Sequence, residues 1–510
     1  MSHRLVRFAP ILALAIAALA WLLAGAASTH GSPAPAAPLP MPHPSVSDYA
    51  QISSSETPPT QAQCASAGRR CFSPQGVRAA YNVAPLYSQG FDGSGRTIAI
   101  VDSYGSDTIA HDLHVFDNAF GIQPMCGEEG VTCSSGMPKF SQLALQGSPA
   151  TKAPPGTSKS PGQEDKSAWA LEVSLDVEMA HSLAPGANIL LVTTPTAETL
   201  GVQGFPQMMA AEKYVAQHHL ADVISQSFGS AEEAFGSAKS LQNLRDGFKA
   251  AAANDVTVLA SSGDSGTANA RKTPVSQGGS TIPVPTVEWP SSDPLVTGVG
   301  GTALCTDPTA STRVVDNTSQ PAACQDPAAQ GQAEIVWGEA SRGIATGGGF
   351  SHVFGRPDYQ GGTLPAGSTP IPAGQRGVPD IGAQASPRTG ALVYITLPPD
   401  GESGLICGSA PCSTGWYDIG GTSLATPEWA GLIGVAAQIH GGGLGQINPA
   451  LYKLASDPGT YGADFNDVTV GNNQVTPDIP GYPATAGWDP DTGLGTPNAA
   501  LLLPDLVGAL

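Results

Sequence analysis

Short apolar segments that alternate with helical segments constrain the fold of this chain more than any other feature. The expected strands are 96–102, 188–194, 222–229, 256–266, 295–302 and 391–397, and the expected helices are 166–184, 205–219, 239–253 and 423–440. Strands that are apolar along most of their length and separated by helices form parallel sheets with both faces covered. We therefore predict an α/β fold with a parallel sheet, helices on both faces and one large domain over residues 73–510.

Polar residues follow three of the expected strands. Asp102 ends the first strand, Ser227 lies near the end of the third, and Asp264 follows the fourth in the stretch SSGDSG. Functional sites in such sheets gather at the carboxyl ends of the strands. These three residues are therefore candidates for a shared site.

The charge balance narrows the possible partners. The 510 residues are 41% hydrophobic and carry a formal net charge of −20. This apolar fraction supports a large core, while the acidic balance excludes nucleic acid, because no basic patch could release counterions. An acidic surface suits a protein that works at low pH, where carboxylates protonate and self-repulsion falls. We expect a monomer.

The first residues have the pattern of a secretory signal. Arg4 and Arg7 precede an apolar run, and small residues at 24–26 offer a cleavage site. We expect residues 1–26 to be a signal peptide and the protein to be secreted. The alternative is an uncleaved membrane anchor, since the run is long for a signal. Residues 27–72, rich in Pro, Ala and Ser, are predicted to be an extended linker.

Eight cysteines follow the expected signal as four pairs of sequence neighbours. The pairs are Cys64 and Cys71, Cys126 and Cys133, Cys305 and Cys324, and Cys407 and Cys412. Exported chains favour disulfides, and four local bridges are the simplest of the many possible pairings. A zinc site is the alternative, but no pair has CxxC spacing with a second Cys or His pair behind it.

The stretch GGTSLATPEWAGL (420–432) presents Ser423 at the expected start of a helix. A serine hydroxyl becomes a nucleophile only when a base takes its proton. Histidine is the usual base, but no histidine of this chain stands in a helix start of the HGT type. The segment ALEVSLDVEMA instead carries Glu172 and Asp176, four residues apart on one face of a helix.

The surroundings of these carboxylates bear on their role. A solvated acidic face is the common explanation for such a pair, but the neighbouring residues of this helix are apolar nearly all round. Two carboxylates on a largely buried helix require compensation. Asp264 is a third acid, and taken alone it is explained by a turn between Gly263 and Gly266.

Together these segments resemble the sedolisins, which are serine-carboxyl peptidases with a subtilisin-like fold. GGTSLATP matches the GTS-x-x-x-P nucleophile motif, ALEVSLD the Glu-x-x-x-Asp motif and SSGDSG the oxyanion-aspartate motif. Further matches, in family order between about residues 73 and 500, are VRAAYNVAPLY, TIAIVDSYG, VISQSFG, GVGGT, TGGGFS, VPDIGAQA and GWDPDTGLGTPN. Several motifs in one order are far more specific than a single motif.

The resemblance implies a subtilisin-like parallel sheet and a peptidase that acts on proteins or peptides in acid. Ser423 would attack the peptide carbonyl, Glu172 would take and return its proton, and Asp176 would orient Glu172. Asp264 would be protonated and would donate a hydrogen bond to the oxyanion. The sequence leaves side-chain preference open, and also the choice between endopeptidase and tripeptidyl-peptidase activity.

The resemblance also implies one structural Ca²⁺ ion near the C-terminus, in residues 463–495. The carboxylates of Asp467 and Asp489 and the carbonyls of Val468, Thr485 and Gly487 would bind it. Calcium prefers six or more oxygen ligands, and glycine lets the backbone approach the ion. Ordinary turns rich in Asp and Gly are the alternative explanation of this composition.

Three points stay open. One alternative is a Ser–His–Asp hydrolase that uses Asp102, Ser423 and a histidine from among His111, His114, His181 and His352. Another is a catalytically inactive, secreted binding protein on the same fold. Sedolisins carry a large N-terminal prodomain, and residues 27–72 are too short for one, so we expect activation to differ or the prodomain to be a separate chain.

Overall fold

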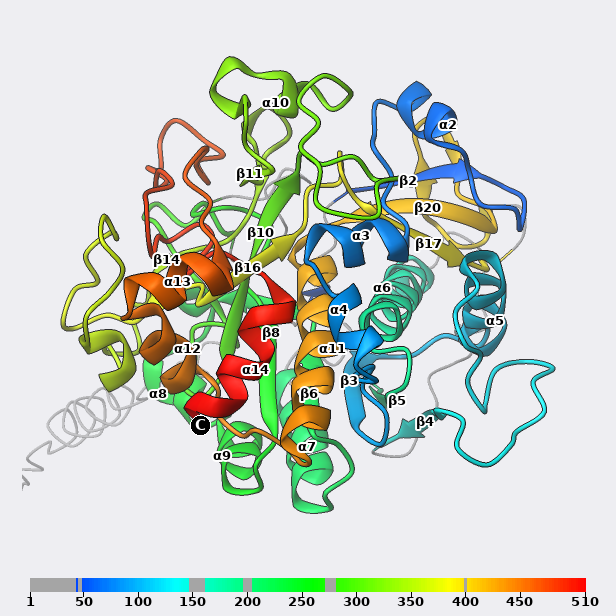
Figure 1. The fold of residues 1–510 in the computed structure, drawn as a ribbon, viewed down its shortest axis with the longest axis horizontal. Coiled ribbons are helices and arrows are strands. Elements are labelled where there is room, and N and C mark those ends of the chain that lie inside the picture. The colour runs from blue at the N-terminus through cyan, green and yellow to red at the C-terminus, as the bar shows by residue number, and fades with distance from the viewer. Residues whose placement is uncertain (1–42, 45–47, 146–160, 196–203, 271–280, 399–400) are drawn as a thin grey trace, which may run out of the picture. The chain divides into compact units, whose positions relative to one another are not determined.

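A mainly parallel sheet of eight strands organises the domain (Figure 1). The structure is a computed structural model that describes residues 43–44, 48–145, 161–195, 204–270, 281–398 and 401–510. The strand order is β11-β10-β8-β6-β3-β5-β4, with β16 beside β10, and only β11 runs antiparallel to its neighbour. The strands are β3 (Thr97–Ser103), β4 (Phe140–Ala144), β5 (Asn188–Thr194), β6 (Val223–Gln226), β8 (Thr257–Ser261), β10 (Thr297–Leu304), β11 (Glu334–Val336) and β16 (Ile381–Gln384).

Helices cover both faces of this sheet, as predicted. Along β3, Ile98 and Ile100 join the buried cluster that includes α6 (Pro161–Leu183), α11 (Thr422–His440) and α14 (Ala499–Ala509). Ala99 and Val101 join the cluster on α7 (Gly204–Gln217) and α9 (Asp246–Ala253). Successive strand residues point to opposite faces, so this alternation shows that both faces are buried.

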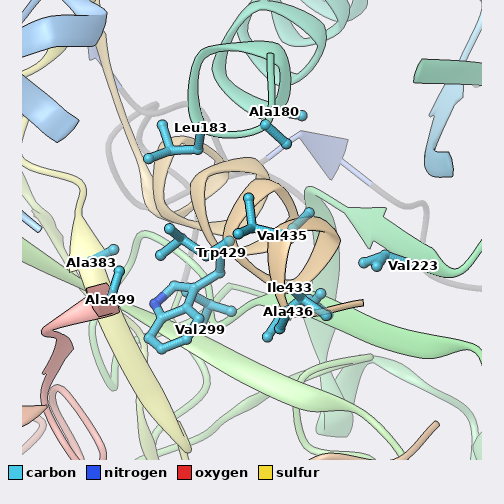
Figure 2. Close-up of a cluster of buried hydrophobic side chains, with 14 of the residues drawn as sticks. Ala180, Leu183, Val223, Val299, Ala383, Trp429, Ile433, Val435, Ala436 and Ala499 are labelled. Carbon is cyan, nitrogen blue, oxygen red and sulfur yellow. The ribbon is translucent and has the colours of Figure 1, made fainter. Parts of the chain in front are cut away.

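The helix α11 forms the centre of the larger cluster (Figure 2). Trp429 and Ile433 of α11 pack with Leu183 of α6 and with Val223 and Val299 of the sheet. All residues of α11 from Thr422 to Ala437 are buried. This agrees with the sequence pattern, which is apolar on nearly all sides of the helix.

A second, antiparallel sheet corrects two predictions. It has the order β17-β20-β2, from β17 (Ala391–Ile395), β20 (Gly415–Gly420) and β2 (Asp48–Ser53). The segment 391–397 is therefore not part of the parallel sheet. The later part of the expected linker is ordered, because Tyr49 and Ile52 pack against the cluster of β17 and β20, and α2 (Gln61–Ser66) follows. The Pro- and Ser-rich composition of residues 27–72 did not indicate this strand and helix.

The predicted local disulfides are present. The bonded pairs are Cys64–Cys71, Cys126–Cys133, Cys305–Cys324 and Cys407–Cys412. The expected signal peptide, residues 1–26, lies outside the described residues. Within the described residues, no helix is long and apolar enough to cross a membrane.

Two expected elements are divided. The helix expected over 239–253 consists of α8 (Ala238–Gln242) and α9, and the strand expected over 222–229 consists of β6 and β7 (Phe228–Ala231). Ser227 lies at the break between β6 and β7. Further elements include α3 (Pro74–Ala80), α4 (Ala84–Ser88), α5 (Ile109–Phe120), α12 (Asn448–Ala455), α13 (Pro458–Asp464), β15 (Gly377–Val378), β21 (Phe465–Asn466) and β22 (Thr496–Pro497).

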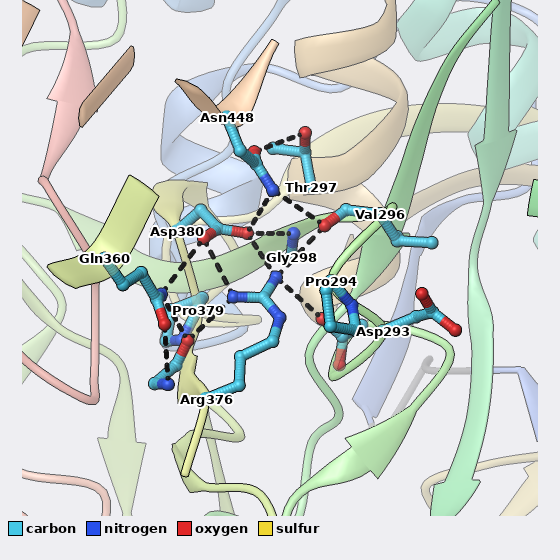
Figure 3. A network of polar contacts seen from close by, with 12 residues as sticks. Asp293, Pro294, Val296, Thr297, Gly298, Gln360, Arg376, Pro379, Asp380 and Asn448 are labelled. Carbon is cyan, nitrogen blue, oxygen red and sulfur yellow. Dashed lines mark hydrogen bonds and ion pairs between the residues drawn. The ribbon is translucent and has the colours of Figure 1, made fainter. Parts of the chain in front are cut away.

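A buried ion pair connects the β15–β16 region to β10 (Figure 3). Arg376 and Asp380 are both fully buried and form two hydrogen bonds, of 2.6 and 3.0 Å. Asp380 also accepts from the backbone N–H of Gly298 at 2.8 Å. A bidentate pair with further donors is the arrangement that makes buried charges tolerable.

Candidate active site

Local backbone chemistry places Ser423 in the first turn of α11. Gly421 caps the helix with φ +134°, a conformation that L side chains rarely adopt. Pro427 lies four residues after Ser423 and has no N–H, so it cannot donate the usual helical hydrogen bond to the Ser423 carbonyl. The Oγ atom of Ser227 lies 3.4 Å from this carbonyl, but its single proton is donated to Asp176, which is closer at 2.9 Å. The hydroxyl of Ser423 donates to the carbonyl of Ser227 at 3.3 Å.

The two carboxylates of α6 lie beside Ser423 and are fully buried. Glu172 and Asp176 have no solvent exposure, because α6 packs against α11 through Val173 and Val177 and against the second sheet through Leu171. A solvated acidic face is therefore excluded. Because both carboxyls are buried, the charge of either one must be compensated when it ionises, as the sequence pattern predicted.

Burial and neighbouring acids raise the pKa of both groups. The pKa of Glu172 lies well above its ordinary value, because of burial first and then the nearby charges of Asp176, Asp102 and Asp264. The Ser423 hydroxyl partly opposes this rise in pKa. It nevertheless donates to a carbonyl here, and neither carboxyl oxygen of Glu172 has a hydrogen-bond partner among the described residues.

Asp176 has one direct donor and one acidic neighbour. Ser227 Oγ donates to its Oδ1 at 2.9 Å, while burial and Asp102 raise its pKa well above the ordinary value. Asp102 is itself fully buried, which raises its pKa to about 8. These three buried carboxyls repel one another, so they cannot all be ionised together. Ser227 is a residue whose role the sequence did not specify.

Asp264 is anchored at the start of α11. Its Oδ1 accepts from the backbone N–H of Thr422 at 2.8 Å and from the Thr422 hydroxyl at 2.9 Å. Thr422 has no distinguishing signal in the sequence, because Ser and Thr are common at helix starts. The structure thus brings Ser423, Glu172, Asp176 and Asp264 into one site.

The histidines considered for a Ser–His–Asp site lie against other acids. His111 is paired with Glu129, His114 with Glu128, His181 with Asp117 and His352 with Glu233. Asp102 is not paired with any of them among the described residues, and its charge instead raises the pKa of Glu172 and Asp176. The arrangement does not favour the histidine alternative.

A short strand from the N-terminal part of the chain runs beside Ser227. β1 (His43–Pro44) pairs antiparallel with β7, with positions 43 and 44 opposite Gly229 and Phe228. β9 (Glu288–Trp289) pairs with the other edge of β7. The edge of β7 opposite β9 therefore accepts an extended backbone segment, which in this structure is the chain's own β1.

The expected calcium ligands lie on two adjoining loops. The N–H of Gly487 donates to Asp467 and the N–H of Thr485 donates to Asp489, both at 3.0 Å. Burial raises the pKa of Asp489 to about 7, so a cation would relieve the cost of ionising it. Among the described residues, no group of three or more His, Cys, Asp or Glu is arranged to hold a metal. The two loops bring Asp467 and Asp489 close to the backbone of Gly487 and Thr485, as the expected ligand set requires.

These observations define the class of the protein. It has a subtilisin-like α/β fold with a serine in the first turn of a central buried helix, surrounded by carboxyls rather than by histidine. The model of the Subtilase family matches residues 159–447, more than half of the chain. The chain belongs to this family, and within it to the sedolisins.

Individual relatives agree with this assignment. The chain is 30% identical to kumamolisin of Bacillus sp. (strain MN-32) over 88% of this chain and 66% of that protein. It is 29% identical to human tripeptidyl-peptidase 1 over 68% of this chain and 53% of that protein. Its structure matches Pseudomonas sedolisin, complexed with pseudo-iodotyrostatin, with a TM-score of 0.60 and 27% identity over 86% of this chain and 98% of that one. The chain spans about two thirds or less of the length of these two curated relatives.

Proposed function

We propose that this protein is a secreted, acid-acting serine-carboxyl peptidase with Ser423, Glu172 and Asp176 as its catalytic triad and Asp264 at the oxyanion. The observation that carries the proposal is the burial of Glu172, without a hydrogen-bond partner among the described residues, beside the hydroxyl of Ser423. A base kept from solvent and close to an alcohol is suited to take its proton.

The reaction follows from these positions. Ser423 Oγ attacks the carbonyl carbon of the peptide bond while its proton passes to Glu172. Because Oδ1 of Asp264 accepts from the Thr422 N–H, the acidic proton of Asp264 belongs on Oδ2, where it stabilises the oxyanion. Glu172 then gives its proton to the leaving amine, and water releases the acyl group by the reverse sequence.

Asp176 acts as a positioning residue in this scheme. We infer that it shares a proton with Glu172 during the reaction, and it is itself held by the Ser227 hydroxyl at 2.9 Å. Asp102 is a third buried acid of the same cluster, and repulsion among the three carboxyls keeps at least one of them neutral. The site therefore needs a pH low enough to leave protons on its acids.

The β1–β7 pairing supports a peptide as the substrate. An extended peptide that takes the place of β1 on β7 would make backbone hydrogen bonds in the same antiparallel register. Such a strand passes Ser227, whose carbonyl is in contact with the Ser423 hydroxyl. The scissile carbonyl is thereby brought to the nucleophile.

We propose one structural Ca²⁺ ion bound by Asp467 and Asp489 together with the carbonyls of Val468, Thr485 and Gly487. Bound calcium would join the two loops and stabilise the folded state by mass action. Chelation followed by a thermal melt tests this. An unchanged melting temperature would exclude a bound ion.

Incubation of a peptide mixture at pH 3–4, with products identified by mass spectrometry, tests the function. We expect cleavage by the wild-type protein and none by Ser423→Ala. Equal cleavage by both would rule out the proposed nucleophile. The product lengths would also distinguish an endopeptidase from a tripeptidyl-peptidase.

A further inference from the structure

Glu288 is a buried carboxyl that the reaction described above does not use. It lies on β9, is 2% exposed, and its Oε2 atom has no hydrogen-bond partner among the described residues. Burial raises its pKa to about 8. A buried carboxyl oxygen without a donor costs free energy, which a ligand carrying a donor would recover.

Two glycines bring this carboxyl next to the candidate active site. A Cβ atom at Gly229 would lie 2.5 Å from Glu288 Oε2, and one at Gly263 would lie 2.6 Å from Glu288 Cδ. Gly229 comes two residues after Ser227, and Gly263 directly precedes Asp264. The carboxyl therefore contacts both segments that flank Ser423, and only residues without side chains leave room for it.

The strand register of the three-stranded sheet β1-β7-β9 determines which substrate side chains would face Glu288. Glu288 lies opposite Ala231 on one edge of β7, and Gly229 lies opposite position 43 of β1 on the other edge, which a substrate would take over from β1. Opposed residues, and residues two apart on a strand, place their side chains on the same face of a sheet. A peptide residue opposite Gly229 thus shares a face with Glu288, and Gly229 places no side chain between them.

We propose that Glu288 selects substrates with arginine or lysine at the residue that supplies the acyl group. This rests on the proposed function, since that residue's carbonyl must lie at Ser423. Its side chain then extends between the segments of Gly229 and Gly263 toward Glu288. A guanidinium or ammonium group would supply N–H donors to this carboxyl, and its positive charge would lower the pKa of Glu288, so that the carboxyl ionises when such a side chain binds. An apolar side chain would leave the carboxyl unpaired.

A series of peptides that differ only at this residue, as Arg, Lys, Gln or Leu, tests the proposal at pH 4. The wild-type protein should cleave the Arg and Lys peptides with kcat/KM at least about tenfold above that of the Leu peptide. Glu288→Gln should lose this preference, while its cleavage of the Leu peptide changes by less than about threefold. Retained cleavage of the Leu peptide also shows that the variant is folded.

Two further variants complete the test. Gly229→Ala places a methyl group where the Glu288 carboxyl lies and should reduce the preference as well. Glu212→Gln is the matched control, because Glu212 of α7 is equally buried and neither of its oxygens has a hydrogen-bond partner among the described residues. It should keep the wild-type preference.

The outcomes separate the two proposals. Cleavage without a preference for Arg or Lys, or an equal loss on every peptide in Glu288→Gln, would overturn the role of Glu288 alone. Failure of the wild-type protein to cleave any peptide would overturn the proposed function, and the specificity with it.

Discussion

The carboxyl of Glu288 should also make the stability of the fold depend on pH, independently of any substrate. Its pKa is about 8 in the folded protein against an ordinary 4.5, and burial is the single cause. A group whose folded pKa is raised stabilises the fold fully below its unfolded pKa. This contribution is lost as the pH rises toward the folded value.

The size of the effect follows from the linkage relation. Each pH unit between the unfolded and folded pKa values removes about 1.4 kcal/mol of the free energy of unfolding. The loss between pH 4.5 and pH 7 is therefore about 3 kcal/mol. In Glu288→Gln this loss is absent, because the amide does not titrate.

Urea unfolding at pH 4.5 and pH 7 measures this difference. Both proteins should carry Ser423→Ala to prevent self-digestion. The free energy of unfolding should fall between the two pH values by about 3 kcal/mol less in the Glu288→Gln protein than in its parent. Any constant cost of burying the amide cancels in this comparison. The same pH dependence in both proteins would refute the reasoning.

Three other substitutions test the site and its support. Glu172→Ala should lower kcat/KM by several orders of magnitude, and adding Ser423→Ala should lower it little further, because the two act as a unit; additive losses would argue against a shared role. Ser227→Ala should lower kcat about 10-fold or more with little change in KM, because Asp176 loses its hydrogen-bond donor. Steady-state kinetics measures both constants, and a change in KM alone would contradict this role. Arg376→Met should destabilise the fold by about 3–5 kcal/mol, because it leaves a buried carboxylate unpaired; an unchanged unfolding midpoint would contradict this.

Apolar periodicity identified most of the elements that position the site. The strands β3, β5, β8 and β10 and the helices α6 and α11 lie where continuous apolar segments predicted them. The pattern could not tell which sheet a strand joins, because strand pairing depends on contacts distant in sequence. The strand at 391–395 is the example, since it is as apolar as its parallel counterparts but pairs antiparallel with β20.

The acids of the candidate site carry a signal in the sequence, and its hydrogen bonds carry less. Glu172 and Asp176 stand out because carboxyls are rare within apolar segments, whereas Asp264 was singled out only by the resemblance of SSGDSG to a family motif. Thr422 carries no such signal, because hydroxyls are common at helix starts, and Ser227 is marked only by its position near the end of an expected strand. Their roles depend on the tertiary contact between α11 and the break after β6, which no local pattern encodes.

The dependence of kcat/KM on pH, measured from pH 2 to pH 8 with a peptide that the protein cleaves, tests the central claim most directly. A carboxyl that must accept a proton and another that must retain one can coexist only in acid. We predict a maximum in acid and a collapse of the rate near neutrality. A maximum at neutral or alkaline pH would contradict catalysis of Ser423 by carboxyl groups.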